Sequence, residues 1–373
     1  MASLSLLATF PGHRTRSGGS LALAASPAGA AGRPADAPAG PALVASGGAD
    51  GKVVVVNASD DPGLAPSARG VATLAHGAAG AGVTALGWAL RGDLLASGGS
   101  DGIVQLWRGA AEGGEGANDA KGAAPSFAFE PSSVATLDAA ASASSASASS
   151  ASASSASASS ALVGVSVHPS STLAFAAHAD ACWRLWDLEA ARAVSALRLP
   201  AGEEGEAFAS AALHPDGLLY ATGTDRGLVK IWEVRAQKPI ATLQAPPPSA
   251  AASPIAALAF SENGYHLASA GGGAARTWDL RKLAPLAQLA SPLGGDSSAD
   301  VSALAFDASG RFLAATEGRR VGVYGAKQGW ELLGTVDALA GKGQARNVAW
   351  GTLAKTLVVG GGDHNLRIFK AGE

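Results

Sequence analysis

Seven histidines and a single cysteine, Cys182, are the residues of this 373-residue chain that could bind a metal ion or act in catalysis. His168 and His214 lie 214−168 = 46 residues apart and each is followed by proline. This spacing indicates two equivalent turns rather than converging ligands. No HxxxH or CxxC spacing occurs, and one cysteine cannot build a cysteine-rich zinc site. The sequence therefore predicts no metal centre and no cofactor.

The other reactive patterns also point away from catalysis. Cys182 lies in the segment ACWRLWD, where an apolar strand predicts a buried, inert thiol. The glycine-rich segment SGGADGK (46–52) lacks the GxxxxGK[ST] spacing of a phosphate-binding loop and precedes a predicted strand instead of a helix. No catalytic residue is predicted anywhere in this chain.

Composition restricts the partners that the chain could bind. The net charge is −3 and 15% of the residues are charged, so the chain has no overall basic field for nucleic acid. One cysteine excludes an internal disulfide and fits a reducing compartment. No apolar run approaches the roughly 20 residues that cross a bilayer. Protein partners are expected, without direct nucleic-acid or membrane binding.

A repeat of about 46 residues organises the chain. Predicted strands end in an aromatic residue at Trp186, Trp232, Trp278, Tyr324 and Phe369, with successive steps of 46, 46, 46 and 45. Such a period, with Trp-Asp dipeptides at 186–187 and 278–279, is typical of WD40 blades. Seven blades of about 40–45 residues need roughly 280–315 residues. The prediction is an all-β, seven-bladed WD40 β-propeller that occupies residues 1–373 as one domain.

Acidic residues recur at one turn of the repeat, before the strand that ends in the aromatic residue. They are Asp50, Asp101, Asp180, Asp225 and Asp363. Blade two alone approaches the full hydrogen-bonded set of WD40 repeats, with His76, Ser97, Asp101 and Trp107. Each bond would contribute about 1 kcal/mol net. We expect a structural role for these residues.

Insertions lengthen the first three blades. Residues 109–126 are rich in Gly, Ala and Glu and predict a flexible loop, whereas Ala139–Ala161 contains only Ala and Ser and predicts a disordered segment. A third insertion at 27–41 holds four prolines. The first 35 residues resemble a transit peptide in composition, but LSLLATF (4–10) predicts a strand that completes the last blade.

Four segments resemble the propeller of the pre-mRNA-processing factor 19 family. They are GGADGKVVVVN (47–57), LHPDGLLYATGTDRGLVKIWEVR (213–235), AFSENGYHLASA (259–270) and WDLRKL (278–283). The resemblance implies a nuclear scaffold of the spliceosome-activating complex, linked to DNA repair and protein ubiquitination. Members of that family are ubiquitin ligases through a U-box and tetramers through a coiled coil. No segment of this chain matches either part, so ligase activity and tetramer formation are not expected of it.

Two other functions compete with the splicing scaffold. Trp278-Asp279-Leu280-Arg281 has the WDxR pattern with which substrate receptors of cullin-type ubiquitin ligases bind their adaptor, although Gly273 replaces the Asp that usually accompanies it. A U-box encoded upstream would instead make the gene product a ligase.

The predicted partner-binding residues are Asn263, Tyr265, Arg281 and Lys282. A tyrosine beside a glycine turn favours an exposed interface aromatic. It could equally be the first packed residue of the next strand. Arg281 and Lys282 could supply basic contacts or be ordinary solvated charges.

Overall fold

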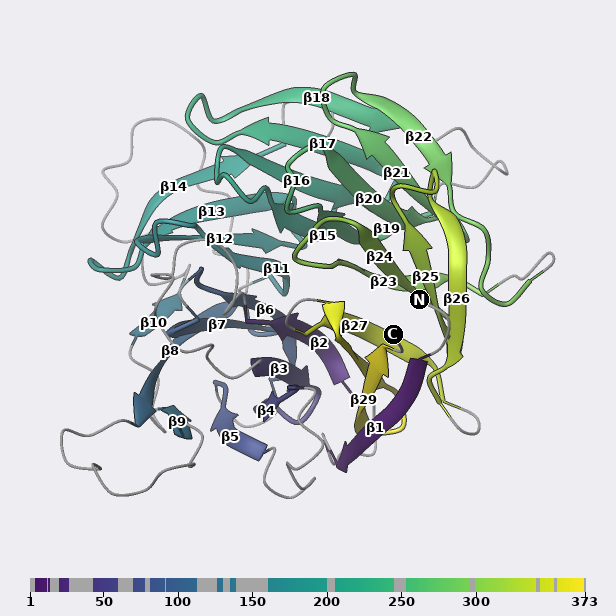
Figure 1. Cartoon of the computed structure of the whole chain (residues 1–373). Helices are drawn as coiled ribbons and strands as arrows, with labels where there is room; N and C mark the ends of the chain where they lie inside the picture. Colours follow the sequence, from purple (N-terminus) through teal and green to yellow (C-terminus); the bar gives the residue numbers. More distant parts are fainter. Residues whose placement is uncertain are drawn as a thin grey trace, which may run out of the picture.

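The computed structural model is a seven-bladed β-propeller (Figure 1). It describes residues 4–11, 13, 20–26, 43–59, 70–77, 81–90, 92–112, 126–129, 135–138, 160–199, 205–244, 253–294, 299–339, 343–351 and 354–371. These residues form antiparallel strands and no α-helix. The predicted fold class is therefore confirmed.

The first three blades carry the irregular features of the ring. Blade one contains β2 (Ser20–Ala25), β3 (Leu43–Gly48), β4 (Lys52–Asn57) and β5 (Gly70–Ala75). Blade two contains β6 (Val83–Trp88), β7 (Leu94–Gly99), β8 (Ile103–Glu112), β9 (Ser126–Phe129) and β10 (Ala135–Asp138). Blade three contains β11 (Leu162–Val167), β12 (Leu173–His178), β13 (Cys182–Asp187) and β14 (Arg192–Arg198).

The remaining blades repeat one four-stranded pattern. Blade four contains β15 (Phe208–Leu213), β16 (Leu219–Thr224), β17 (Leu228–Glu233) and β18 (Lys238–Gln244). Blade five contains β19 (Ile255–Phe260), β20 (His266–Gly271), β21 (Ala274–Asp279) and β22 (Ala284–Gln288). Blade six contains β23 (Val301–Phe306), β24 (Phe312–Glu317), β25 (Arg320–Gly325) and β26 (Glu331–Asp337). Blade seven contains β27 (Ala345–Trp350), β28 (Thr356–Gly361) and β29 (Asn365–Ala371).

The N-terminal strand closes the ring. β1 (Leu4–Pro11) is the outer strand of blade seven and pairs antiparallel with β29, from Leu4 opposite Ala371 to Pro11 opposite Asn365. The two strands lie side by side in Figure 1. This pairing confirms the expectation that residues 4–10 complete the last blade. Because β1 covers the backbone donors and acceptors of β29, the last blade keeps the same outer edge as the others.

The core consists of seven apolar clusters, each shared by two neighbouring blades. The cluster between blades three and four contains Trp183 and Trp232, whose rings meet edge to face at 5.9 Å. Ala8 of β1 joins the cluster between blades seven and one. Burial of apolar surface between the sheets thus runs without interruption around the ring, and it provides the main driving force for closure. The repeat aromatics lie in this core: Trp107, Trp186, Trp232, Trp278, Tyr324 and Phe369 are all at most 4% exposed.

The loop predicted at 109–126 is partly a strand. β8 continues through Glu112 and pairs with β9, from Gly109 opposite Phe129 to Glu112 opposite Ser126. The reason is the apolar sequence SFAF, which provides a partner strand and packs Phe129 against Trp88 with a centroid distance of 5.7 Å. The predicted boundaries of this loop are therefore wrong, because strand structure extends into both ends of residues 109–126. The rest of it, the proline-rich insertion and residues 139–159 of the Ala/Ser tract lie outside the described residues.

Candidate interaction surface

The propeller has two faces with different turns. The turns between the second and third strands carry the recurrent aspartates, and we call this side the Asp-turn face. The turns between the first and second strands lie on the opposite side, because consecutive strands are antiparallel. We call that side the hairpin face, and it includes Leu90, Pro169, Pro215 and the turn Ser261–Tyr265.

The four residues of the set predicted in blade two lie together, with hydrogen bonds at Ser97 and a longer contact between His76 and Asp101. Trp107 Nε1 donates to Ser97 Oγ at 2.8 Å, and Ser97 Oγ lies 2.7 Å from His76 Nδ1. His76 Nε2 faces Asp101 Oδ1 at 3.7 Å. Burial lowers the pKa of His76, and the nearby Asp101 carboxylate only partly offsets this. These distances fit a neutral His76. Its Nδ1 accepts a hydrogen bond from Ser97, and its Nε2 hydrogen points toward Asp101.

Blade one contains a second version of the network, which sequence reasoning identified only in part. His13 follows β1 and is 1% exposed. Its Nδ1 lies 2.9 Å from Asp50 Oδ1, and its Nε2 lies 3.0 Å from Ser46 Oγ. The histidine therefore ties the segment after the closing strand to the first blade. No tryptophan completes this set, because Val56 stands at the repeat position of Trp107.

Arginine partners replace histidine at two of the other aspartates. Asp363 pairs with Arg367, whose hydrogen bonds hold the pKa of Asp363 below its usual range although burial opposes ionisation. Asp180 lies 4.0 Å from Arg184 and 3.5 Å from Arg198. Sequence reasoning missed these arginines. The detectable signal was the shared spacing of four residues from Asp180 to Arg184 and from Asp363 to Arg367.

Asp225 has a simpler role in blade four. Its carboxylate accepts a hydrogen bond from the backbone nitrogen of Ala207 at 3.1 Å, beside the backbone bond from Asp225 N to Ala207 O at 2.9 Å. The aspartate thus fixes the start of β15 against the turn. All five recurrent aspartates make contacts within or between turns, and these contacts hold the ends of neighbouring strands together.

His168 and His214 lie on the hairpin face, and each contacts the next blade along the chain. They do not face a common site. His214 Nε2 donates to the carbonyl oxygen of Gly264 in blade five at 3.0 Å. The imidazole of His168 occupies the space where a Cβ on Gly217 of blade four would lie. Gly217 and Gly264 have φ values of 75° and 72°, in the left-handed region that glycine tolerates best. Glycine at these turns therefore gives both the required backbone shape and the space for the neighbouring histidine.

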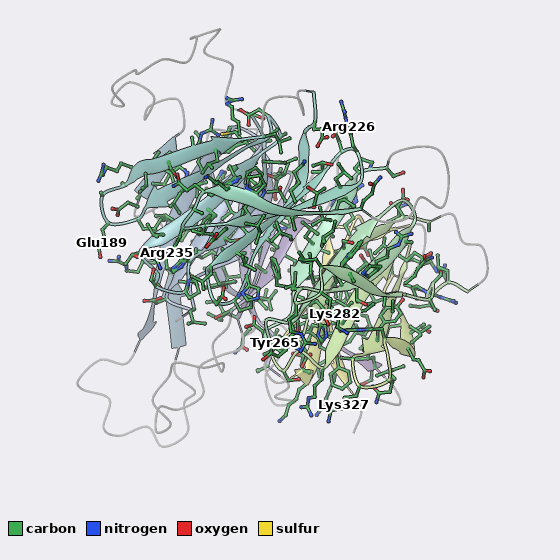
Figure 2. The ribbon with its side chains drawn as sticks, turned by 90° about the horizontal axis from the view of Figure 1, so that it is seen from above. Glu189, Arg226, Arg235, Tyr265, Lys282 and Lys327 are labelled. Atoms are coloured by element: carbon green, nitrogen blue, oxygen red, sulfur yellow. The ribbon has the colours of Figure 1, made fainter. Side chains whose placement is uncertain are left out.

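The four predicted partner-binding residues lie on blade five, and three of them are directly linked. Tyr265 precedes β20 and is 52% exposed. The guanidinium carbon of Arg281 lies 5.0 Å from the centre of the Tyr265 ring, within the range of a cation–π contact. Asn263 Oδ1 accepts from the backbone nitrogen of Tyr265 at 2.9 Å. Lys282 is exposed beside this group (Figure 2). We call these four residues the Tyr265 surface.

Arg281 is held in place by the aspartate of the WDxR segment. Its Nη2 lies 3.1 Å from Asp279 Oδ2 and its Nε lies 3.3 Å from Asp279 Oδ1. These hydrogen bonds lower the pKa of Asp279, so the pair stays ionised. The Arg281 side chain is nevertheless 63% exposed. The Tyr265 surface therefore presents an aromatic ring and a fixed cation to solvent.

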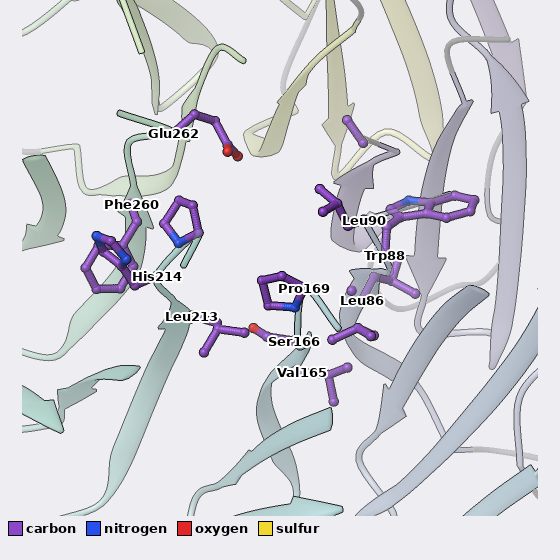
Figure 3. Close-up of a pocket in the computed structure, with 14 residues that line it drawn as sticks. Leu86, Trp88, Leu90, Val165, Ser166, Pro169, Leu213, His214, Phe260 and Glu262 are labelled. Carbon is purple, nitrogen blue, oxygen red and sulfur yellow. The ribbon is translucent and has the colours of Figure 1, made fainter. Parts of the chain in front are cut away.

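A pocket of about 270 Å³ opens on the hairpin face, where the first strands of blades one to five end (Figure 3). Leu86, Leu90, Pro169, Leu213 and Phe260 line it, and Glu262 stands at its edge. The central channel continues from the same strands and is lined mostly by Ala, Leu, Val, Ser and Thr. No group of three or more metal-ligating side chains occurs among the described residues. The part of the chain that the structure describes also contains no helix capable of crossing a membrane.

Cys182 has the character expected of a core thiol. It is 1% exposed, and burial raises its pKa. A thiol with a raised pKa carries little thiolate near neutral pH and is a poor nucleophile.

Two family models match the chain. Residues 70–108 match the WD domain, G-beta repeat, and they span β5 of blade one and β6 to β8 of blade two, where His76, Ser97 and Trp107 are hydrogen-bonded. The chain is a seven-bladed β-propeller with a WD40 repeat. Residues 146–326 match the model of the Nucleolar protein 10-like N-terminal domain, a β-propeller. No curated protein gives a significant match. The specific resemblance to pre-mRNA-processing factor 19 therefore has no counterpart among these matches, whereas the propeller itself does.

Proposed function

We propose that this WD40 propeller is a non-catalytic scaffold that assembles nuclear proteins of pre-mRNA splicing and that binds them through the Tyr265 surface. The observation that carries the proposal is the exposed Tyr265 ring with Arg281 stacked on it. Aromatic and arginine side chains are enriched where interfaces gain most of their binding energy. Hydrogen bonds from Arg281 to Asp279 preorganise this pair, so little side-chain entropy is lost on binding.

The assignment to splicing rests on the sequence resemblance described above. The nuclear location has independent but general support, since the model matched by residues 146–326 is named for a nucleolar protein. Links to DNA repair and to ubiquitination of bound partners follow from the same resemblance and belong to this proposal. WD40 propellers generally mediate protein–protein interaction, which is consistent with protein partners here.

A cullin-type substrate receptor is the second candidate, favoured by one observation. Arg281 of the WDxR segment is 63% exposed on the hairpin side of blade five and could reach an adaptor protein. Both candidate functions use Arg281, so a mutation of Arg281 would not distinguish the scaffold from the receptor. The identity of the proteins that the chain captures distinguishes them.

The deciding experiment is affinity purification of the tagged full chain from nuclear extract, followed by mass spectrometry. Enrichment of splicing factors supports the scaffold, whereas a cullin and its adaptor without splicing proteins would replace it with the receptor function. We expect Tyr265→Ala to weaken partner capture and to change stability by less than about 1 kcal/mol, because the side chain is half exposed. Val194→Ala on β14, also 51% exposed, is the matched control and should leave capture unchanged.

A further inference from the structure

The pocket on the hairpin face is formed by parts of five blades. Its lining includes Ala25 from blade one, Leu90 from blade two, Pro169 from blade three, Leu213 from blade four and Phe260 from blade five. Figure 3 shows these side chains arranged around one open space. Leu90 is 38% exposed although it is a large apolar residue. A concavity that is assembled from separate blades and lined by both apolar side chains and polar groups can receive a ligand side chain that carries a polar end.

A single acidic side chain gives this pocket its charge. Within the described residues that line the pocket, Glu262 is the only carboxylate, and Figure 3 shows it directed into the open space. It forms no ion pair with any other described residue. Glu262 is exposed to solvent at the pocket edge. Desolvation by the surrounding residues raises its pKa, His214 lowers it and the carboxylate of Asp307 raises it. A cation placed in the pocket would stabilise the ionised form of Glu262.

The turn that carries Glu262 is held firmly in place. His214 bonds the carbonyl oxygen of Gly264, and Asn263 bonds the backbone of Tyr265. Phe260 packs edge to face against the His214 ring at 5.1 Å. The same hairpin therefore directs Glu262 toward the channel mouth and places Tyr265 on the outer surface. A partner that covers this hairpin can contact both.

We propose that the channel-mouth pocket binds an extended segment of a partner protein, with one arginine or lysine side chain paired to Glu262 and apolar neighbours against Leu90, Pro169 and Phe260. This inference rests on the proposed scaffold function and identifies the chemistry of one partner contact. A lone carboxylate beside apolar side chains such as Leu90 and Phe260 favours a peptide over a hydrated metal ion, which needs several oxygen ligands. The negative charge of Glu262 disfavours a nucleic-acid backbone.

The test uses the full chain and four pools of nonapeptides with random flanking residues. The central residue is fixed as Arg, Lys, Gln or Glu, and binding of each labelled pool to the immobilised chain is measured. We expect the Arg and Lys pools to bind about tenfold better than the Gln pool, as one charge-assisted hydrogen bond implies. The Glu pool should bind least. The preference should decrease as salt concentration rises.

Two variants connect the preference to the pocket. Glu262→Gln should remove the advantage of the basic pools over the Gln pool, and Glu262→Lys should favour the Glu pool. Glu331→Gln, on the exposed start of β26, is the matched control and should retain the wild-type preference. Unchanged melting temperatures establish that each variant is folded.

Equal binding of all pools, or a basic preference that survives in Glu262→Gln, would overturn the pocket inference. These results are distinguishable from failure of the proposed function. A chain that captures splicing factors but shows no basic preference retains its scaffold role and loses this contact. A chain that prefers basic peptides but captures no splicing factors keeps the pocket and loses the assigned pathway.

Discussion

Replacing Ser97 by alanine provides a quantitative test of the blade-two network. The Ser97 hydroxyl is completely buried and serves two partners, His76 Nδ1 at 2.7 Å and Trp107 Nε1 at 2.8 Å. Alanine leaves both partner nitrogens without a hydrogen bond inside the protein. Each lost bond costs about 1 kcal/mol net and a buried unsatisfied group up to about 3 kcal/mol. We therefore expect Ser97→Ala to lower the free energy of unfolding by about 2–4 kcal/mol.

Blade five offers a matched comparison with one bond fewer. Ser269 is also buried, and among the described residues its side chain bonds only Trp278 Nε1, at 2.8 Å. Ser269→Ala removes the same atom from the equivalent strand, so its expected cost is about 1–2 kcal/mol. The difference between the two variants isolates the contribution of the histidine bond.

The assay is urea unfolding of the full chain, monitored by tryptophan fluorescence and circular dichroism. Linear extrapolation gives the free energy of unfolding where both probes coincide. If the free energy of unfolding depends on urea concentration with the same slope in the variants as in the wild type, the loss of stability arises in the folded state. If Ser97→Ala lowers the free energy of unfolding no more than Ser269→Ala does, the hydrogen bond between Ser97 and His76 contributes nothing to stability. The view that this histidine bond stabilises blade two would then be wrong.

Four further predictions concern stability. Burial lowers the pKa of His178, so the unfolded chain binds more protons than the folded chain near and below pH about 6.5. The free energy of unfolding should therefore decrease as the pH is lowered from about 7.5 to about 5.5. His178→Asn should weaken this pH dependence, as measured by urea titrations at several pH values. Deletion of Leu4–Pro11 exposes the edge of β29 and should produce aggregates that elute earlier than the full chain on size-exclusion chromatography. Gly217→Ala should lower the melting temperature, through its positive φ and overlap with His168, by an amount equivalent to about 1 kcal/mol or more. Replacing residues 139–159 by a short Gly/Ser linker should leave melting unchanged, and a large drop would contradict the prediction of a dispensable insertion.

The sequence alone was sufficient to predict the architecture. Its 46-residue spacing of aromatic residues is a local property of each repeat, and one blade cannot bury its apolar faces without neighbours. The closing strand was equally predictable, because LSLLATF had no other sheet edge to complete. The blade-two network followed from its four residue types at their repeat positions.

Some local structure was not predictable because it depends on a distant partner. Residues 109–112 have the composition of a loop, and they form a strand only because SFAF at 126–129 returns to pair with them. Arg184 and Arg367 are a different case, because each faces an aspartate four residues earlier in the chain and that shared spacing was visible in the sequence. Residue composition carries no information on such pairing across an insertion.

The candidate surfaces show the same division. From the sequence, Tyr265 could be exposed or packed, and its 52% exposure and contact with Arg281 depend on how β21 ends beside the hairpin. The pocket at the channel mouth gave no sequence signal at all, because its walls come from five blades whose lining residues are far apart in the chain. The sequence by itself thus determined the repeat, the ring and its closure, since these follow from periodic burial. Only the tertiary structure decided which side chains from different blades share a surface, because this depends on the register and position of each blade around the axis.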